Sequence, residues 1–134
     1  MEWKNFTLIG LGLIGGSIAK AIKKAYPRAK ISVLEKDQHS VEMAISEGII
    51  EKGLQSIEEI PSDTELLFLC TPVEWNRIFL RELAPKLSSH TLLTDVGSTK
   101  RSIMEEAEAL GLASRFCGGH PMAGSESSGY QASD

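Results

Sequence analysis

Three glycines near the start of the chain have the spacing of a phosphate-binding turn. Gly10, Gly12 and Gly15 form the pattern Gly-x-Gly-x-x-Gly between an apolar run at 6–9 and a segment with helical periodicity. In such a strand–turn–helix, the glycines permit a sharp turn, close approach of a pyrophosphate and tight helix packing. The helix N-terminus would present free N–H groups to the phosphates. The pattern predicts a dinucleotide site, and a purely structural turn is the alternative.

Charged residues follow the second predicted strand, where this type of site binds the adenosine ribose. An acidic side chain there accepts both ribose hydroxyls. Glu35 is the first candidate and Asp37 the second. A carboxylate at this point repels a 2′-phosphate and therefore favours NAD over NADP. Lys36 weakens that preference because a neighbouring cation could accept the phosphate, and all three charges could instead be solvated in a turn.

Further cofactor contacts are predicted at the end of a later strand. The apolar run 65–70 is typical of a buried strand and ends at Thr71 and Pro72. Because ligands bind at the carboxyl ends of parallel strands, we expect both residues to contact the cofactor, although a simple turn is the alternative. Leu13 and Ile14, inside the glycine turn, are also predicted to contact the cofactor.

Two further loops carry unusual polar residues. One contains Ser98, after the predicted strand 91–95, and the other contains His120 and Glu126. A neutral histidine suits proton transfer at physiological pH, but His120 could also simply hydrogen-bond its neighbours. Ser98 at a helix start is by default an N-cap, and Glu126 is by default a solvated charge.

The remaining pattern alternates strands and helices. This alternation predicts an α/β fold, a doubly wound and mostly parallel Rossmann sheet with helices on both faces. A single helical turn is expected between 54 and 60. The predicted strands are 6–9, 31–34, 49–50, 65–70, 91–95 and a short one from 115; the predicted helices run from about 14 to 22, 40 to 47, 75 to 87 and 103 to 110. The inward residues are expected to be Val41, Ala44 and Ile45 in the second helix, and Ile78, Phe79, Leu83 and Leu87 in the third.

Length and composition limit the possible functions. We expect the 134 residues to form a single domain, 1–134. The net charge of −4 and the scattered basic residues argue against nucleic acid as a partner. No apolar run approaches a membrane span, and no signal-peptide pattern opens the chain. Cys70 and Cys117 are expected to be buried free thiols in a reducing cytosol, with no metal site. We therefore expect a cytoplasmic protein.

Three stretches together resemble one enzyme family. They are Gly10-Leu-Gly-Leu-Ile-Gly-Gly-Ser17, Asp95-Val-Gly-Ser-Thr-Lys100 and Gly119-His-Pro-Met-Ala-Gly-Ser-Glu126. In this order and spacing they are similar to the nucleotide-binding half of prephenate dehydrogenases, which make the tyrosine precursor and have arogenate-using relatives. The resemblance covers essentially the whole chain, and its His-Pro-Met-Ala-Gly stretch is far more specific than the glycine pattern.

The resemblance implies a reaction and roles for three residues. Prephenate would give a hydride from C4 to NAD, its C4 hydroxyl would lose a proton, and the ring carboxylate would leave as CO2 to form 4-hydroxyphenylpyruvate. By resemblance, His120 hydrogen-bonds the hydroxyl and accepts its proton. Ser98 orients His120 and touches the nicotinamide end, and Glu126 lies at the mouth of the substrate pocket.

The chain also departs from the family pattern. The family has a helical domain that forms a homodimer and helps to bind the substrate carboxylates, whereas this sequence stops at Asp134. We therefore expect a fragment or truncated chain that binds NAD, binds prephenate poorly and has little or no turnover. Its oligomeric state stays open. The alternatives are an arogenate dehydrogenase, a 3-hydroxyacid or imine reductase of related fold, and a non-catalytic NAD-binding regulatory module.

Overall fold

A computed structural model of the chain describes residues 3–71, 73–88, 90–95, 109–111 and 116–118. Its elements follow the order β1 (Asn5–Ile9), α1 (Gly12–Ala25), β2 (Lys30–Leu34), α2 (Gln38–Ser46), β3 (Lys52–Leu54), the 3-10 turn η1 (Ile57–Glu59), β4 (Leu66–Leu69), α3 (Val73–Leu83), β5 (Leu92–Asp95) and β6 (Phe116–Gly118). The predicted helix 103–110 lies almost wholly outside the described residues.

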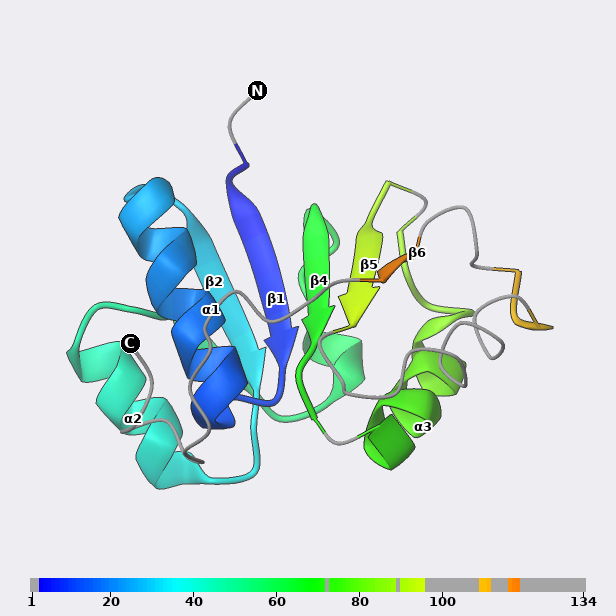
Figure 1. Cartoon of the computed structure of the whole chain (residues 1–134), viewed down its shortest axis with the longest axis horizontal. Coiled ribbons are helices and arrows are strands. Elements are labelled where there is room, and N and C mark those ends of the chain that lie inside the picture. Colours follow the sequence, from blue (N-terminus) through cyan, green and yellow to red (C-terminus); the bar gives the residue numbers. More distant parts are fainter. Residues whose placement is uncertain (1–2, 72, 89, 96–108, 112–115, 119–134) are drawn as a thin grey trace.

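The strands form one parallel sheet of order β3-β2-β1-β4-β5-β6. This is the strand order of a doubly wound dinucleotide-binding fold, with β1 at the point where the order reverses. Figure 1 shows the arrows of β1, β2, β4 and β5 ending at the same lower edge of the sheet. The Rossmann fold predicted from the sequence is therefore confirmed.

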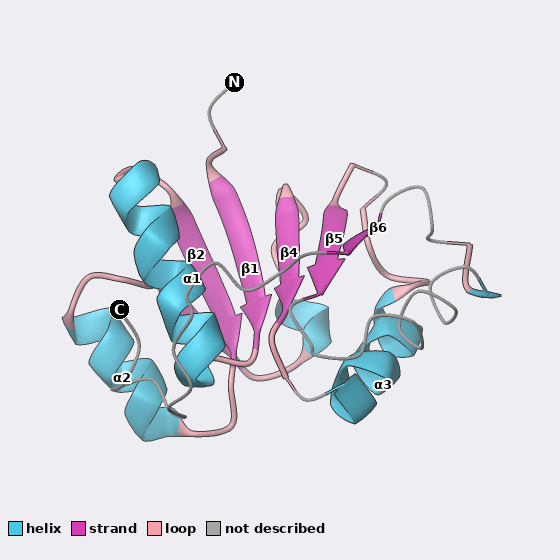
Figure 2. Ribbon diagram, in the orientation of Figure 1, coloured by secondary structure: helices cyan, strands magenta, loops and turns pink. Residues whose placement is uncertain are grey.

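The two faces of the sheet have separate apolar cores, because successive strand residues point to opposite faces. Phe6 and Leu8 of β1 pack with side chains of α1 and α2, among them Ile18 and Val41. Ile9 packs on the other face, with residues of β4, β5 and α3. Figure 2 shows α1 and α2 beside β1 and β2, while α3 lies toward β4 and β5.

Two predictions of helix orientation are wrong. The sequence pattern predicts that Ile45 of α2 and Ile78 of α3 face inward, but both are 43% exposed. The buried positions of α3 include Asn76, Leu80 and Leu83, spaced at i, i+4 and i+7. The polar contacts of Asn76 hold this side of the helix against the sheet, which places Ile78 on a different side.

The predicted end of α3 is also wrong. The sequence pattern extends this helix to Leu87, but it ends at Leu83, two residues before Pro85. Proline disfavours helical geometry in the residue before it, so Ala84 does not continue the helix. The chain instead forms a turn in which the amide of Lys86 donates to the Leu83 carbonyl at 2.8 Å.

The third strand lies later in the chain than predicted. The prediction places it at Ile49–Ile50, but β3 spans Lys52–Leu54. The amides of Ile49 and Ile50 donate to the Ala44 carbonyl at 2.9 and 3.4 Å, which ties them to the end of α2. Gly48, with φ of +74°, makes this reversal possible. The single helical turn expected between 54 and 60 is present as η1.

Candidate nucleotide-binding site

The glycine turn lies directly after β1, at the carboxyl edge of the sheet. Gly10 has φ of +97° and its amide donates to the Leu34 carbonyl of β2 at 2.8 Å. A Cβ at Gly10 would lie 2.6 Å from Cγ2 of Thr71, so this turn also packs tightly against the end of β4. The turn is therefore fixed between its two neighbouring strands.

Gly15 and Gly12 are needed for different reasons. A Cβ at Gly15 would lie only 2.5 Å from the carbonyl oxygen of Gly10, so another residue would push α1 away from the turn. A Cβ at Gly12 would meet nothing within 4 Å, but its φ of +38° disfavours other residues. Gly12 thus leaves open space beside the first turn of α1, whose early N–H groups have no acceptor within the helix. These features fit a pyrophosphate.

The Glu35 side chain links β2 to the glycine turn. Its Oε1 accepts a hydrogen bond from the Leu11 amide at 2.7 Å, and its Oε2 accepts one from the Asp37 amide at 3.0 Å. Each carboxylate oxygen keeps further acceptor capacity. The structure therefore places the first predicted ribose ligand beside the predicted phosphate turn.

Asp37, the second ribose candidate, is the N-cap of α2. Its carboxylate accepts hydrogen bonds from the His39 amide at 3.2 Å and the Ser40 hydroxyl at 2.8 Å. The Ser40 hydroxyl, followed by the backbone N–H donors, lowers the pKa of Asp37 below its usual value. Of the two carboxylates, the geometry therefore favours Glu35 as the ribose ligand.

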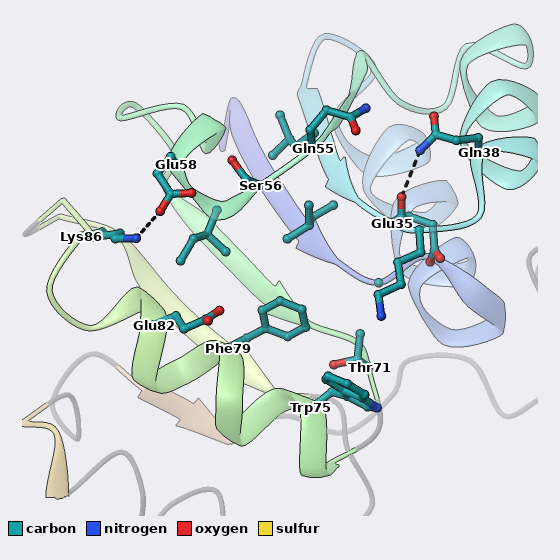
Figure 3. Close-up of a pocket in the computed structure, with 15 residues that line it drawn as sticks. Glu35, Gln38, Gln55, Ser56, Glu58, Thr71, Trp75, Phe79, Glu82 and Lys86 are labelled. Carbon is teal, nitrogen blue, oxygen red and sulfur yellow. Dashed lines mark hydrogen bonds and ion pairs between the residues drawn. The ribbon is translucent and has the colours of Figure 1, made fainter.

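A cavity of about 640 Å³ extends from the glycine turn between β2, β3 and α3. Figure 3 shows Glu35 and Gln38 at one end, Glu58 and Lys86 at the other, and Trp75 and Phe79 along one wall. The size is typical of a small-molecule site. Its apolar lining consists of Leu34, Leu54, Ile57, Trp75 and Phe79; its other lining residues are Gly10, Glu35, Lys36, Gln38, Gln55, Ser56, Glu58, Thr71, Glu82 and Lys86.

An ion pair marks the far end of this cavity. Lys86, after α3, donates to Oε2 of Glu58 in η1. The Lys86 ammonium lowers the pKa of the Glu58 carboxyl. The pair forms the end of the cavity opposite Glu35 (Figure 3). Because both side chains are substantially exposed, it adds little to the stability of the fold.

A buried asparagine of α3 connects the ends of two neighbouring strands, β4 and β5. Asn76 is 0% exposed; its Oδ1 accepts from the Thr71 amide at 3.1 Å and from the Thr71 hydroxyl. Its Nδ2 donates to the Leu69 carbonyl at 3.4 Å and to Oδ1 of the buried Asp95. All the polar groups of this side chain are thus used. The network fixes Thr71, which lines the cavity, relative to the end of β5.

The structure brings three of the predicted cofactor contacts that it describes together at the cavity. Gly10, Glu35 and Thr71 line the cavity, and the Thr71 hydroxyl is engaged by Asn76. Leu13 and Ile14 lie in the first turn of α1, both partly buried, and Ile14 packs against the core. The predicted residues Pro72, Ser98, His120 and Glu126 lie outside the described residues.

Sequence patterns do not identify several of the cavity residues. Leu54, Trp75 and Phe79 have the residue types and spacing of ordinary core or helix residues, and their positions on the cavity wall depend on tertiary packing. Asn76 offered a usable signal: it is a polar residue at a position of α3 that is in register with Leu80 and Leu83. Such a residue inside an apolar stripe indicates a buried hydrogen-bonding role.

The remaining observations concern thiols, histidines and metals. Cys70 is a free cysteine, and desolvation, followed by the charge of Asp95, raises the pKa of its thiol. His39 and His90 are exposed. Among the described residues, no three His, Cys, Asp or Glu side chains are grouped as metal ligands. Within the same ranges, no helix combines the length and apolarity that a membrane span requires.

The strand order and the glycine–Glu35 arrangement define a Rossmann dinucleotide-binding domain. Comparison of sequences gives the family: the family described as "Prephenate dehydrogenase, nucleotide-binding domain" matches residues 18–134. The chain therefore belongs to the prephenate dehydrogenase family, as its three sequence stretches predicted.

Individual relatives agree with this assignment. The prephenate dehydrogenase of Bacillus subtilis (strain 168) is 43% identical over 128 residues, covering 93% of this chain and 34% of that protein. A crystal structure of A. aeolicus prephenate dehydrogenase with hydroxyphenyl propionate and NAD+ is similar with a TM-score of 0.87 at 32% identity, covering 100% of this chain and 47% of that one. Synechocystis arogenate dehydrogenase gives a TM-score of 0.84 at 31% identity, covering 97% and 45%. The chain thus spans about a third of the curated relative.

Proposed function

We propose that this chain binds NAD as the cofactor-binding half of a prephenate dehydrogenase. The observation that carries the proposal is the contact between the Glu35 carboxylate and the Leu11 amide, at the mouth of a cavity of suitable size. Family membership supports it, as does the similar A. aeolicus enzyme, whose structure contains NAD+.

The described residues suggest how the adenosine half would bind. The adenine would lie against the apolar cavity wall that includes Leu54 and Phe79. Glu35 would accept hydrogen bonds from the ribose hydroxyls, and the pyrophosphate would approach at Gly12. The nicotinamide end would accept a hydride from the substrate, and by the family resemblance Ser98 would contact it.

For the reaction, we propose oxidative decarboxylation of prephenate to 4-hydroxyphenylpyruvate, a step toward tyrosine. His120 would hydrogen-bond the C4 hydroxyl of the substrate and accept its proton, and Ser98 would orient His120. Glu126 would lie at the mouth of the substrate pocket. These roles are supported by family membership and by the Gly119–Glu126 stretch of the sequence.

Two alternatives remain in view. The 31% identity to an arogenate dehydrogenase favours arogenate as the second candidate substrate. A non-catalytic NAD-binding module is the other, and it would need neither His120 nor Ser98. We further propose that a helical domain, as in the family, completes the substrate site and forms a homodimer, so this chain alone would have little turnover.

Calorimetric titration with NAD and with NADP tests the binding proposal. We expect NAD to bind well ahead of NADP, because the Glu35 carboxylate repels a 2′-phosphate. Tighter binding of NADP would overturn the cofactor assignment but not the fold, and binding of neither would contradict the proposal for this chain.

A second experiment tests the catalytic proposal. The chain would be joined to the helical domain of a family member and assayed with prephenate and with arogenate, alongside the variant His120→Asn. We expect activity that the variant largely loses. Activity that survives in the variant would show that His120 is not the proton acceptor, and the preferred substrate would decide between prephenate and arogenate.

A further inference from the structure

A cation–π contact spans the cavity that we assign to adenosine. Nζ of Lys36 lies 4.9 Å from the centroid of the Trp75 ring. Lys36 follows β2 directly, whereas Trp75 belongs to the first turns of α3, and both line the cavity. Trp75 is 47% exposed, so its indole ring is not part of the core. Because the two residues lie 39 positions apart in the sequence, this contact arises only from the fold.

Lys36 is the cation closest in sequence to the predicted ribose ligand. NADP differs from NAD only by a phosphate on the ribose 2′ oxygen, and a protein that accepts NADP supplies a cation there. Of the described residues that line the cavity, two are lysines, and Lys86 is bonded to Glu58 at the far end. Lys36 is therefore the lysine available to neutralise a 2′-phosphate beside Glu35.

We propose that Trp75 is a specificity-determining residue, which holds the Lys36 ammonium over its indole ring and away from the 2′-phosphate position. The discrimination between the two nucleotides then has two sources. Glu35 repels the 2′-phosphate. Trp75 keeps the Lys36 ammonium from approaching that phosphate, where its charge would otherwise offset the repulsion. This inference rests on the proposed function, because it assumes that the cavity binds the adenosine half of a dinucleotide.

The size of the effect follows from the contact. An exposed cation–π pair changes an equilibrium by about two- to five-fold. Replacing Trp75 by an apolar residue without an aromatic face should therefore lower the ratio of the NADP Kd to the NAD Kd by about that factor. The change should come mainly from tighter binding of NADP.

The test measures the Kd of four ligands for the whole chain by calorimetry. NAD and NADP are compared directly, while AMP and adenosine 2′,5′-bisphosphate isolate the half of the cofactor that the described cavity would hold. The variants are Trp75→Leu, Trp75→Phe as the control that keeps an aromatic ring, Lys36→Met, and the double variant Lys36→Met/Trp75→Leu. Thermal melts check that these substitutions at exposed positions leave the fold intact.

We expect Trp75→Leu to lower both phosphate-discrimination ratios, Trp75→Phe to change them much less, and the effect of Trp75→Leu to vanish in the Lys36→Met background. Unchanged ratios in Trp75→Leu, or an equal change with and without Lys36, would overturn the inference. An equal loss of affinity for NAD and NADP in Lys36→Met would also overturn it, because Lys36 would then contact a part that both nucleotides share. If the unmodified chain bound none of the four ligands, the proposed function itself would fail.

Discussion

Oε1 of Glu35, at the end of β2, accepts a hydrogen bond of 2.7 Å from the amide of Leu11 in the glycine turn. This contact joins the residue that would bind the ribose to the segment that would bind the pyrophosphate. The same carboxylate also accepts from the Asp37 amide. Glu35 is therefore held in place before any ligand arrives, and a preorganised group loses little entropy on binding.

The variant Glu35→Ala should weaken NAD binding by roughly ten- to a hundredfold, because hydrogen bonds to a charged group are worth about 1.5–3 kcal/mol. NADP should be affected much less, because the substitution also removes repulsion of the 2′-phosphate. Calorimetric titration of both nucleotides measures the difference. Glu51→Gln, at an exposed position away from the cavity, is the control. Equal losses for NAD and NADP would show that Glu35 does not contact the ribose.

Gly12→Ala and Gly15→Ala should have different consequences. At Gly15 the added Cβ would lie 2.5 Å from the Gly10 carbonyl oxygen, so the variant should lose about 1–3 kcal/mol of stability as well as nucleotide binding. At Gly12 the Cβ meets no protein atom within 4 Å, so the variant should lose stability mainly through its positive φ, about 1 kcal/mol, while binding NAD far more weakly.

Urea denaturation and calorimetry on the same samples would separate these two effects. A Gly12→Ala variant that binds NAD normally would contradict the assignment of the pyrophosphate to this turn. A Gly15→Ala variant with unchanged stability would show that α1 can shift away from the turn without penalty.

The sequence predicts those parts of the site that depend on local chemistry. The glycine spacing and the acidic residue after β2 are local features, and the fold brings Glu35 and Leu11 together as they indicate. The face of α3 could not be predicted from apolar periodicity, because a buried polar residue, Asn76, decides it. The contact between Lys36 and Trp75 could not be predicted from the sequence either, since it depends on how α3 packs against the sheet and where this places Trp75 relative to the residue after β2.

Removing the Asn76 side chain should be strongly destabilising. In Asn76→Leu the buried Asp95 loses the amide donor to its Oδ1, and Thr71 loses its acceptor. We expect a loss of roughly 2–4 kcal/mol in the free energy of unfolding, because the substitution leaves the buried Asp95 carboxylate without one of its hydrogen-bond donors. Urea denaturation measures the loss.

Exchanging the two side chains between positions 76 and 95 tests whether the contact between Asn76 and Asp95 is the cause of this loss. Asn76→Asp places two carboxylates together and should destabilise strongly. In the double variant Asn76→Asp/Asp95→Asn, the amide introduced on β5 can instead donate to the carboxylate introduced on α3. The double variant should therefore be more stable than the sum of the two single changes predicts, by about 0.5–3 kcal/mol. Simple additivity would mean that the two side chains do not interact.

The last prediction concerns Glu65, which fixes the segment that enters β1. Its Oε1 accepts from the amides of Lys4 at 2.7 Å and Asn5 at 2.9 Å. These N–H donors, that of Lys4 first, lower the pKa of Glu65 below its usual value of 4.5. A carboxyl whose pKa is lower in the folded state adds stability above pH 4.5, and this contribution disappears as the pH falls through the lowered pKa.

Glu65→Ala should therefore reduce the free energy of unfolding at pH 7 by about 0.5–1 kcal/mol, a figure kept small because solvent screens a partly exposed carboxylate. Glu65→Gln should lose less, since its amide oxygen still accepts both hydrogen bonds. The difference between the unmodified chain and Glu65→Ala should shrink below about pH 4, as measured by urea denaturation at pH 7, 5 and 3. The exposed Glu42 gives the control Glu42→Gln. A deficit in Glu65→Ala that stayed constant down to pH 3 would show that the charge of Glu65 is not what stabilises this contact.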